Sequence, residues 1–88
     1  MKKILFFHTR WCPPCRNAMK TKILPLIDQF GNEKIEVIDA DVNPQFAEKC
    51  GVTKLPAFFY IYPEQHIYMR VDHYSFQQLK ELLDDKGN

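Results

Sequence analysis

The sequence lacks a long apolar run, and it lacks a marked excess of charge of either sign. No stretch approaches the roughly 18 apolar residues of a membrane span, and the run Ile4–Phe7 ends at His8, short of the ~7 residues of a secretion signal. Twelve Lys and Arg stand against eleven Asp and Glu, a formal net charge of +1, and no basic stripe stands out along the chain. We therefore expect a cytoplasmic protein that binds neither nucleic acid nor membranes.

The chain is also poor in cysteine, and its three cysteines cannot build a framework of paired structural disulfides. Cys12 and Cys15 are separated by only two residues, whereas Cys50 stands alone. In a reducing compartment, a C-x-x-C pair is more often redox-active or metal-binding than a structural crosslink. The pair is therefore the first candidate for chemistry.

Internal repeats, low-complexity stretches and linkers are absent, and 88 residues are too few for two domains. Hydrophobic residues make up 45% of the chain and aromatic residues 14%, which is enough for one compact core. We predict a single domain over residues 1–88 and expect it to be a monomer.

Short apolar runs between turn residues predict four strands, and apolar side chains at helical spacing predict three helices. The order is β-α-β-α-β-β-α, and a right-handed crossover pairs the first two strands in parallel. This order predicts an α/β fold with a four-stranded mixed sheet flanked by helices. The expected strands cover residues 3–9, 35–41, 56–62 and 66–71, and the expected helices cover 13–30, 44–50 and 76–83.

Three local signals refine the helices. Pro25 lacks the N–H that would bond Thr21, so we expect a kink or two helical pieces in the first helix. Asn43 before Pro44 is typical of a helix N-cap. Ser75 and Gln78 have the spacing of a capping box at the start of the last helix.

Cys12 follows the first strand and stands at or just before the first turn of the first helix. Unpaired N–H groups and the helix dipole stabilise a thiolate there, so we expect the pKa of Cys12 to be lowered and this residue to be the nucleophile. Arg10, Arg16 and Lys54 could add positive potential, and no acidic residue lies within ten positions of Cys12.

Cys15 lies three residues further on, on the same helix face and nearer the core. We expect Cys12 to attack a partner's disulfide and Cys15 to resolve the mixed disulfide, ending as a Cys12–Cys15 disulfide. No organic or metal cofactor is implied, because the two sulfurs hold the electrons. Pro13 and Pro14 suit the first helical turn and stiffen it.

Trp11-Cys12-x-Pro14-Cys15 after an apolar strand resembles the thioredoxin superfamily, and the two prolines resemble its tryparedoxin and nucleoredoxin version. Residues 51–59 resemble the loop and strand that carry a cis proline beside the active site, and residues 39–44 resemble the family's strand-to-helix junction. The resemblance implies a minimal thioredoxin-like fold and a thiol–disulfide oxidoreductase that reduces protein disulfides.

The same resemblance implies roles for other residues and for partners. Leu55–Pro56 would be cis, and the Leu55 backbone would pair with an extended substrate segment. Trp11 would lie exposed beside the pair as part of the docking surface. Electrons would come from a donor such as thioredoxin reductase or glutathione.

The sequence also departs from the family pattern. The leading strand and helix of the family are absent, and Phe6 stands where the family commonly has a buried Asp. Val37 stands where a Lys often accompanies that Asp, so the proton of Cys15 would need another acceptor, such as water. Asp72 replaces a Gly of the docking surface.

Three alternatives stay open. The protein could be recharged by glutathione in the manner of a glutaredoxin, or it could be a binding module with incidental cysteines. The cysteine pair could also be half a zinc site, completed by Cys50 and by His8, His66 or His73. Cys50 itself suits a small buried apolar position or a regulatory thiol, and His8 suits a surface position or a proton shuttle.

Overall fold

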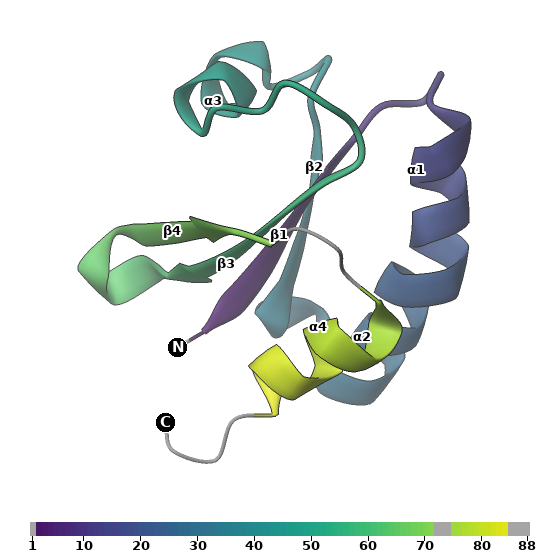
Figure 1. Cartoon of the computed structure of the whole chain (residues 1–88), viewed down its shortest axis with the longest axis vertical. Coiled ribbons are helices and arrows are strands. Elements are labelled where there is room, and N and C mark those ends of the chain that lie inside the picture. The colour runs from purple at the N-terminus through teal and green to yellow at the C-terminus, as the bar shows by residue number, and fades with distance from the viewer. Residues whose placement is uncertain (1, 72–74, 85–88) are drawn as a thin grey trace.

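The strands of the computed structural model form where the sequence has its short apolar runs. The structure describes residues 2–71 and 75–84, and within these it has one four-stranded sheet in the order β2-β1-β3-β4 (Figure 1). The strands are β1 (Lys3–His8), β2 (Ile35–Asp39), β3 (Ala57–Tyr62) and β4 (Ile67–Arg70). β1 pairs in parallel with β2, and the β1–β3 and β3–β4 pairs are antiparallel. The predicted mixed sheet and element order are confirmed.

Helices cover both faces of this sheet. Figure 1 shows α1 and α2 with α4 on one side and α3 on the other. The helices are α1 (Pro13–Ala18), α2 (Leu24–Phe30), α3 (Pro44–Lys49) and α4 (Phe76–Leu83). None of the described helices is both long and apolar enough to cross a membrane.

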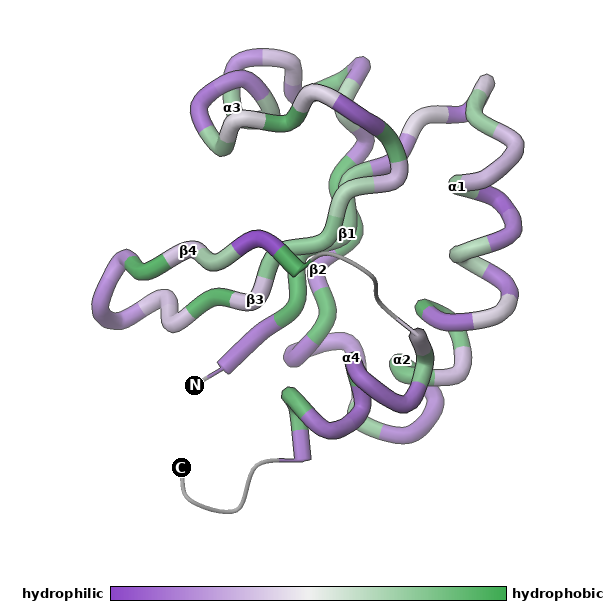
Figure 2. Tube along the Cα trace, viewed as in Figure 1, coloured by the Kyte–Doolittle hydropathy of each residue, from purple (hydrophilic) through white to green (hydrophobic). Residues whose placement is uncertain are grey.

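Alternation along the central strands explains why both faces are covered. Ile4 and Phe6 of β1 lie in one apolar cluster with the α1–α2 segment and α4, whereas Leu5 and Phe7 lie in a second cluster with α3. All four side chains are buried, which is why the run reads as continuously apolar (Figure 2).

The predicted helix over residues 13–30 is divided into pieces. A π-helical segment, Met19–Ile23, separates α1 from α2, and Pro25 lies just after it. Because Pro25 has no N–H to donate to Thr21, the regular bonding pattern cannot pass through this point. The expectation of two helical pieces is confirmed, and the interruption lies one turn before the proline.

The other helix starts were predicted with mixed success. Ser75 Oγ accepts a hydrogen bond from the backbone N of Gln78 at 3.1 Å, as the capping box predicts. Asn43 does stand before α3, but its side chain donates to the Asp39 carbonyl at 3.2 Å instead of capping the helix. The predicted N-cap position of Asn43 before Pro44 is therefore confirmed, but its side chain does not cap α3.

Candidate active site at the carboxyl end of the central strands

Strand register brings three loops to one end of the sheet. His8, the last residue of β1, is aligned with Asp39 of β2, and the backbone N of Ala40 donates to the His8 carbonyl at 2.8 Å. Phe7 is aligned with Ala57, the residue after Pro56. The segments after β1, after β2 and before β3 therefore meet where the central strand ends, the usual place for sites in α/β sheets.

The cysteine pair lies at the start of α1. Cys12 is the N-cap residue, and its Sγ accepts a hydrogen bond from the backbone N of Cys15 at 3.2 Å. Pro13 and Pro14 occupy the first two helical positions. Cys12 and Cys15 form a disulfide, with their Cα atoms 5.2 Å apart. The predicted position of the pair at the helix start is confirmed.

Both cysteines are buried. Cys12 is 4% exposed and Cys15 1%, so Cys12 is not openly accessible in the disulfide form, while the burial of Cys15 agrees with its expected place nearer the core. The residues next to them in sequence are exposed instead: Trp11 is 66% exposed, and Pro13 and Pro14 are exposed too. The buried Cys12 is therefore flanked in sequence by a rim of exposed side chains, those of Trp11, Pro13 and Pro14.

An aspartate that sequence reasoning missed completes this rim. Trp11 Nε1 donates a hydrogen bond to Asp41 Oδ2 at 2.8 Å, across 30 positions of sequence. Asp41 is in turn held by its backbone N, which donates to Asp39 Oδ1 at 2.8 Å. The available signal was the position of Asp41 just after a strand parallel to β1, because the ends of such strands share one edge.

The proline loop also reaches this edge. The Leu55–Pro56 peptide is cis, as predicted. Leu55 is partly buried and packs against the apolar cluster on the α3 side of the sheet. Its role in pairing with a substrate segment remains a prediction.

Beneath the site, an aromatic ring replaces the family's carboxylate. Phe6 is fully buried, and its strand neighbour in the register is Val37, so the two departures from the family pattern lie side by side. The ring of His8 stacks on that of Phe6 at 5.5 Å between centroids. The position of the missing Asp therefore supplies no acceptor for the proton of Cys15.

A groove runs along α1 on the side of Cys15. Its volume is about 750 Å³, and its walls include His8, Thr9, Cys15 and several basic side chains. Thr9 is 2% exposed, and its Oγ1 has no hydrogen-bond partner among the described residues. An unpaired buried hydroxyl is costly, so this position is unusual.

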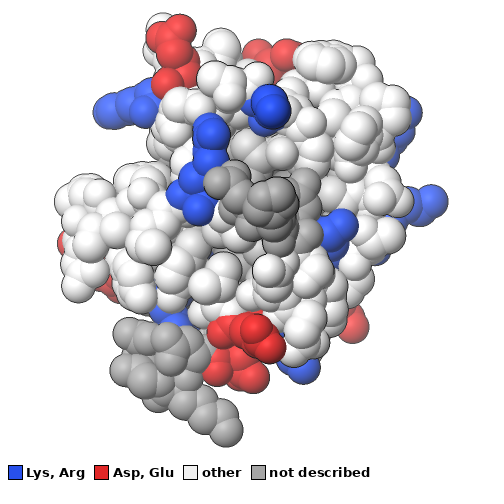
Figure 3. All heavy atoms as spheres, viewed as in Figure 1, with Lys and Arg blue, Asp and Glu red and all other residues white. Residues whose placement is uncertain are grey.

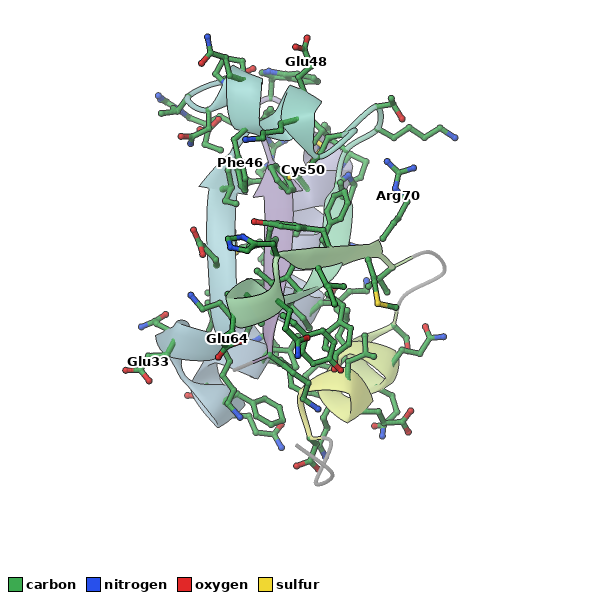
Figure 4. All side chains as sticks on the ribbon, turned by 90° about the vertical axis from the view of Figure 1, so that its left-hand side faces the viewer. Glu33, Phe46, Glu48, Cys50, Glu64 and Arg70 are labelled. Carbon is green, nitrogen blue, oxygen red and sulfur yellow. A yellow bond between two sulfur atoms is a disulfide. The ribbon has the colours of Figure 1, made fainter. Side chains whose placement is uncertain are left out.

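Cys50 lies apart from the pair, at the C-cap of α3. It lines a separate cavity of about 390 Å³ between α3 and the β3–β4 hairpin. Figure 4 shows Cys50 and Phe46 on the side of α3 that faces the sheet. Burial raises the pKa of the Cys50 thiol, and the charge of Lys49 opposes that shift. The expectation of a small packed residue is met in part, since Cys50 is only partly buried.

A zinc site would need a cluster of ligands around the cysteine pair. Within residues 2–71 and 75–84, no three His, Cys, Asp or Glu side chains are close enough together to hold a metal ion. Asp72 and His73 lie outside the described residues. Lys54 is exposed in the loop before Pro56.

Comparisons with known proteins agree with the fold and with the cysteine pair at the helix start. The family model described as Thioredoxin matches residues 2–85. Mitochondrial thioredoxin-3 of Saccharomyces cerevisiae is 32% identical over 57 residues, which cover 65% of this chain and 44% of the yeast protein. Thioredoxin of Bacillus subtilis is 29% identical over 80 residues, which cover 89% of this chain and 75% of the bacterial protein.

A solved structure extends the likeness to the whole sheet. Thioredoxin 1 from Thermosipho africanus superposes with a TM-score of 0.70 at 22% identity, covering 93% of this chain and 90% of that one. At this identity the likeness concerns the fold. The chain spans less than half the length of the yeast relative.

Proposed function

This chain belongs to the thioredoxin family, and from that premise we propose that it is a general reductant of protein disulfides, acting through Cys12 and Cys15. The observation that carries the proposal is the disulfide at the helix start, at the same edge as the cis Leu55–Pro56 peptide. A thiol–disulfide oxidoreductase needs two sulfurs within one turn and a surface against which a partner can lie.

The reaction has two exchange steps. The Cys12 thiolate attacks one sulfur of the target disulfide, the target's S–S bond breaks, and the departing thiolate takes up a proton. Cys15 then loses its proton and attacks Cys12 Sγ, which releases the second target thiolate and leaves the Cys12–Cys15 disulfide. Two electrons pass from the protein to the target, and water receives the proton of Cys15 because Phe6 cannot.

The hydrogen bond from the Cys15 backbone N to Cys12 Sγ supports the choice of Cys12 as nucleophile. That donor and the helix start favour negative charge on this sulfur when the disulfide is open. Cys15 is almost fully enclosed, which suits the resolving thiol.

Substrate docking is assigned to the rim. The exposed Trp11, held by Asp41, would pack against the target, and the Leu55 backbone would pair with an extended target segment. We propose a cytoplasmic site of action, with thioredoxin reductase as the electron donor. Coupled assays with that reductase, and separately with glutathione and its reductase, distinguish this donor from a glutaredoxin-like route.

Insulin reduction with dithiothreitol tests the proposal. The wild-type protein should accelerate precipitation of the insulin chains, and Cys12→Ser should fall to the rate of dithiothreitol alone. Cys50→Ser is the matched control and should stay within about twofold of wild type, because Cys50 lines a separate cavity. Equal rates for wild type and Cys12→Ser would favour the binding-module alternative.

A trapping experiment identifies the natural partners. Cys15→Ser removes the resolving thiol, so mixed disulfides through Cys12 should accumulate and can be isolated under non-reducing conditions. Cys12→Ser should capture none of the same proteins.

A further inference from the structure

The amino-terminal part of the chain carries only one sign of charge. Residues 1–27 contain six basic residues and no Asp or Glu, and Asp28 is the first acidic residue. The segment includes β1, the cysteine pair and most of the helical segment that follows. The basic residues are Lys2, Lys3, Arg10, Arg16, Lys20 and Lys22.

Three of these basic side chains line the groove along α1. Arg10, Arg16 and Lys20 share the groove with Cys15, and no acidic side chain is among its described lining residues. All three are exposed, and none forms an ion pair within residues 2–71 and 75–84. Figure 3 shows Lys and Arg atoms gathered along the side of the molecule where α1 lies.

The positions of these charges are partly fixed. Arg16 Nη1 donates a hydrogen bond to the Arg10 carbonyl at 2.8 Å, which ties the Arg16 side chain to the loop just before Cys12. Lys20 lies one helical turn further along the same segment, in the π-helical stretch. The cationic surface therefore starts beside the disulfide and extends away from it along the helix.

We propose that this groove binds an acidic segment of the target protein, close in sequence to the target's reactive cysteine. The inference rests on the proposed function, since it names the class of substrate for the same site. Unpaired cations on a concave wall attract carboxylates, and their effect falls on encounter rate and specificity.

The geometry favours a polypeptide and gives its spacing. Cys15 lines the groove but Cys12 does not, and their Cα atoms are 5.2 Å apart. A target joined to Cys12 must therefore extend past Cys15 to reach the basic side chains. Arg16 and Lys20 lie four and eight positions beyond Cys12 along the helical segment, about 6 and 12 Å at a rise of ~1.5 Å per residue. At ~3.3 Å per extended residue, acidic side chains about two to four positions from the target cysteine span these distances.

Matched peptides test the proposal. Each peptide carries one cysteine as a mixed disulfide with neutral 2-thiopyridine, followed at the second to fourth positions by three Glu, three Gln or three Lys. The second-order rate constant of the reduced protein is measured at low ionic strength from the release of thiopyridone. Exposed ion pairs each shift such a ratio by only about 1.4-fold to fivefold, so we expect the Glu peptide to react roughly three to ten times faster than the Lys peptide.

Variants test whether the groove causes the preference for the Glu peptide. Arg16→Gln combined with Lys20→Gln should reduce the Glu-to-Lys ratio to within about twofold. The control is Lys34→Gln combined with Lys80→Gln, which removes the same charge outside the groove and should keep the wild-type ratio. Raising the salt concentration should lower the ratio for wild type, because the charges are exposed.

A binding measurement separates this inference from the proposed function. The same peptides with Ser in place of Cys are titrated into the oxidised protein, and Trp11, the single tryptophan, reports binding by fluorescence. A lower Kd for the Glu peptide supports the groove even if no peptide disulfide is reduced, in which case the redox function is what fails. Equal rate constants and equal Kd values for the Glu and Lys peptides, or a preference unchanged in the groove variant, would overturn the inference.

Discussion

At the residue scale, different single positions orient the reactive cysteines and determine which groups lie beside them. Cys12 caps α1 with its own sulfur, and Trp11 beside it turns outward onto Asp41. Phe6 and Thr9, by contrast, place an aromatic ring and an unpaired hydroxyl where partners for Cys15 would be useful. The reactive pair is thus well oriented, while the buried ring of Phe6 offers no acceptor for the proton of Cys15.

The buried hydroxyl of Thr9 provides a stability prediction. Thr9→Val keeps the shape of the side chain and removes the unpaired oxygen, so we expect the free energy of unfolding of the oxidised protein to rise by about 1 kcal/mol. Urea unfolding measures this as a higher midpoint at unchanged slope. Thr53→Val, at an exposed site, is the control. A comparable loss of stability in Thr9→Val would mean that the hydroxyl has a partner.

Cys50 provides a pH prediction. With Cys12 and Cys15 joined in a disulfide, Cys50 is the one thiol left to react. Burial raises its pKa, so less thiolate is present at pH 8 than in an ordinary cysteine, and alkylation by iodoacetamide should be slower by roughly threefold or more. The rate should rise with pH and level off above the pKa of a free cysteine peptide. Lys49→Gln should slow the reaction further, whereas a faster reaction in that variant would show that the Lys49 charge does not lower the pKa of Cys50.

At the element scale, helix starts and interruptions were predictable where the signal is local. The capping box at Ser75 and the break near Pro25 follow from neighbouring residues, and both are present. Asn43 shows the limit of such signals. Its amide bonds the carbonyl of Asp39 at the end of β2, so the turn between β2 and α3 decides where that side chain points.

The α4 cap is testable by mutation. Ser75→Ala removes the side-chain acceptor for the Gln78 N–H and should lower the free energy of unfolding by about 1 kcal/mol. Ser75→Asp keeps an acceptor at the same position and should stay close to wild type. Both variants are compared by urea unfolding, and equal losses in the two would show that the cap is not the cause.

At the scale of the whole molecule, one sheet separates two apolar clusters, and each cluster depends on helices far away in sequence. α4 closes the cluster on the α1 side, and Leu79 is its fully buried residue there. In a domain of 88 residues, the margin of stability is small, so each such contact matters.

Shortening the Leu79 side chain should remove much of the free energy of unfolding. Leu79→Ala is expected to lower the free energy of unfolding by roughly 2–5 kcal/mol, because it removes buried methyl groups and leaves a cavity. Leu24→Ala is the matched control, since Leu24 is 53% exposed and should change stability little. Thermal unfolding followed by circular dichroism compares the two, and similar melting temperatures would show that α4 is not needed for the core.

The sequence by itself predicted the reactive pair and the order of strands and helices along the chain, and its resemblance to a family predicted the cis proline loop. Each depends on residues close together in the chain, or on motifs that stand in a known order: an apolar run, two prolines at a helix start, a Leu-Pro before a strand. Short-range sterics and apolar periodicity account for the helix start and the strands, whereas the cis proline was expected only from the resemblance to the thioredoxin superfamily.

Tertiary structure decided the surroundings of that pair. Asp41 reaches Trp11 only because β2 lies parallel to β1. The enclosure of Cys12 and the unpaired hydroxyl of Thr9 also come from tertiary packing. The groove beside Cys15, in contrast, is lined by residues 8–20 alone and follows from the end of β1 and the helix after it. Burial of the pair and the contact between Asp41 and Trp11 depend on segments that are distant in sequence, and no local pattern records which of them will meet.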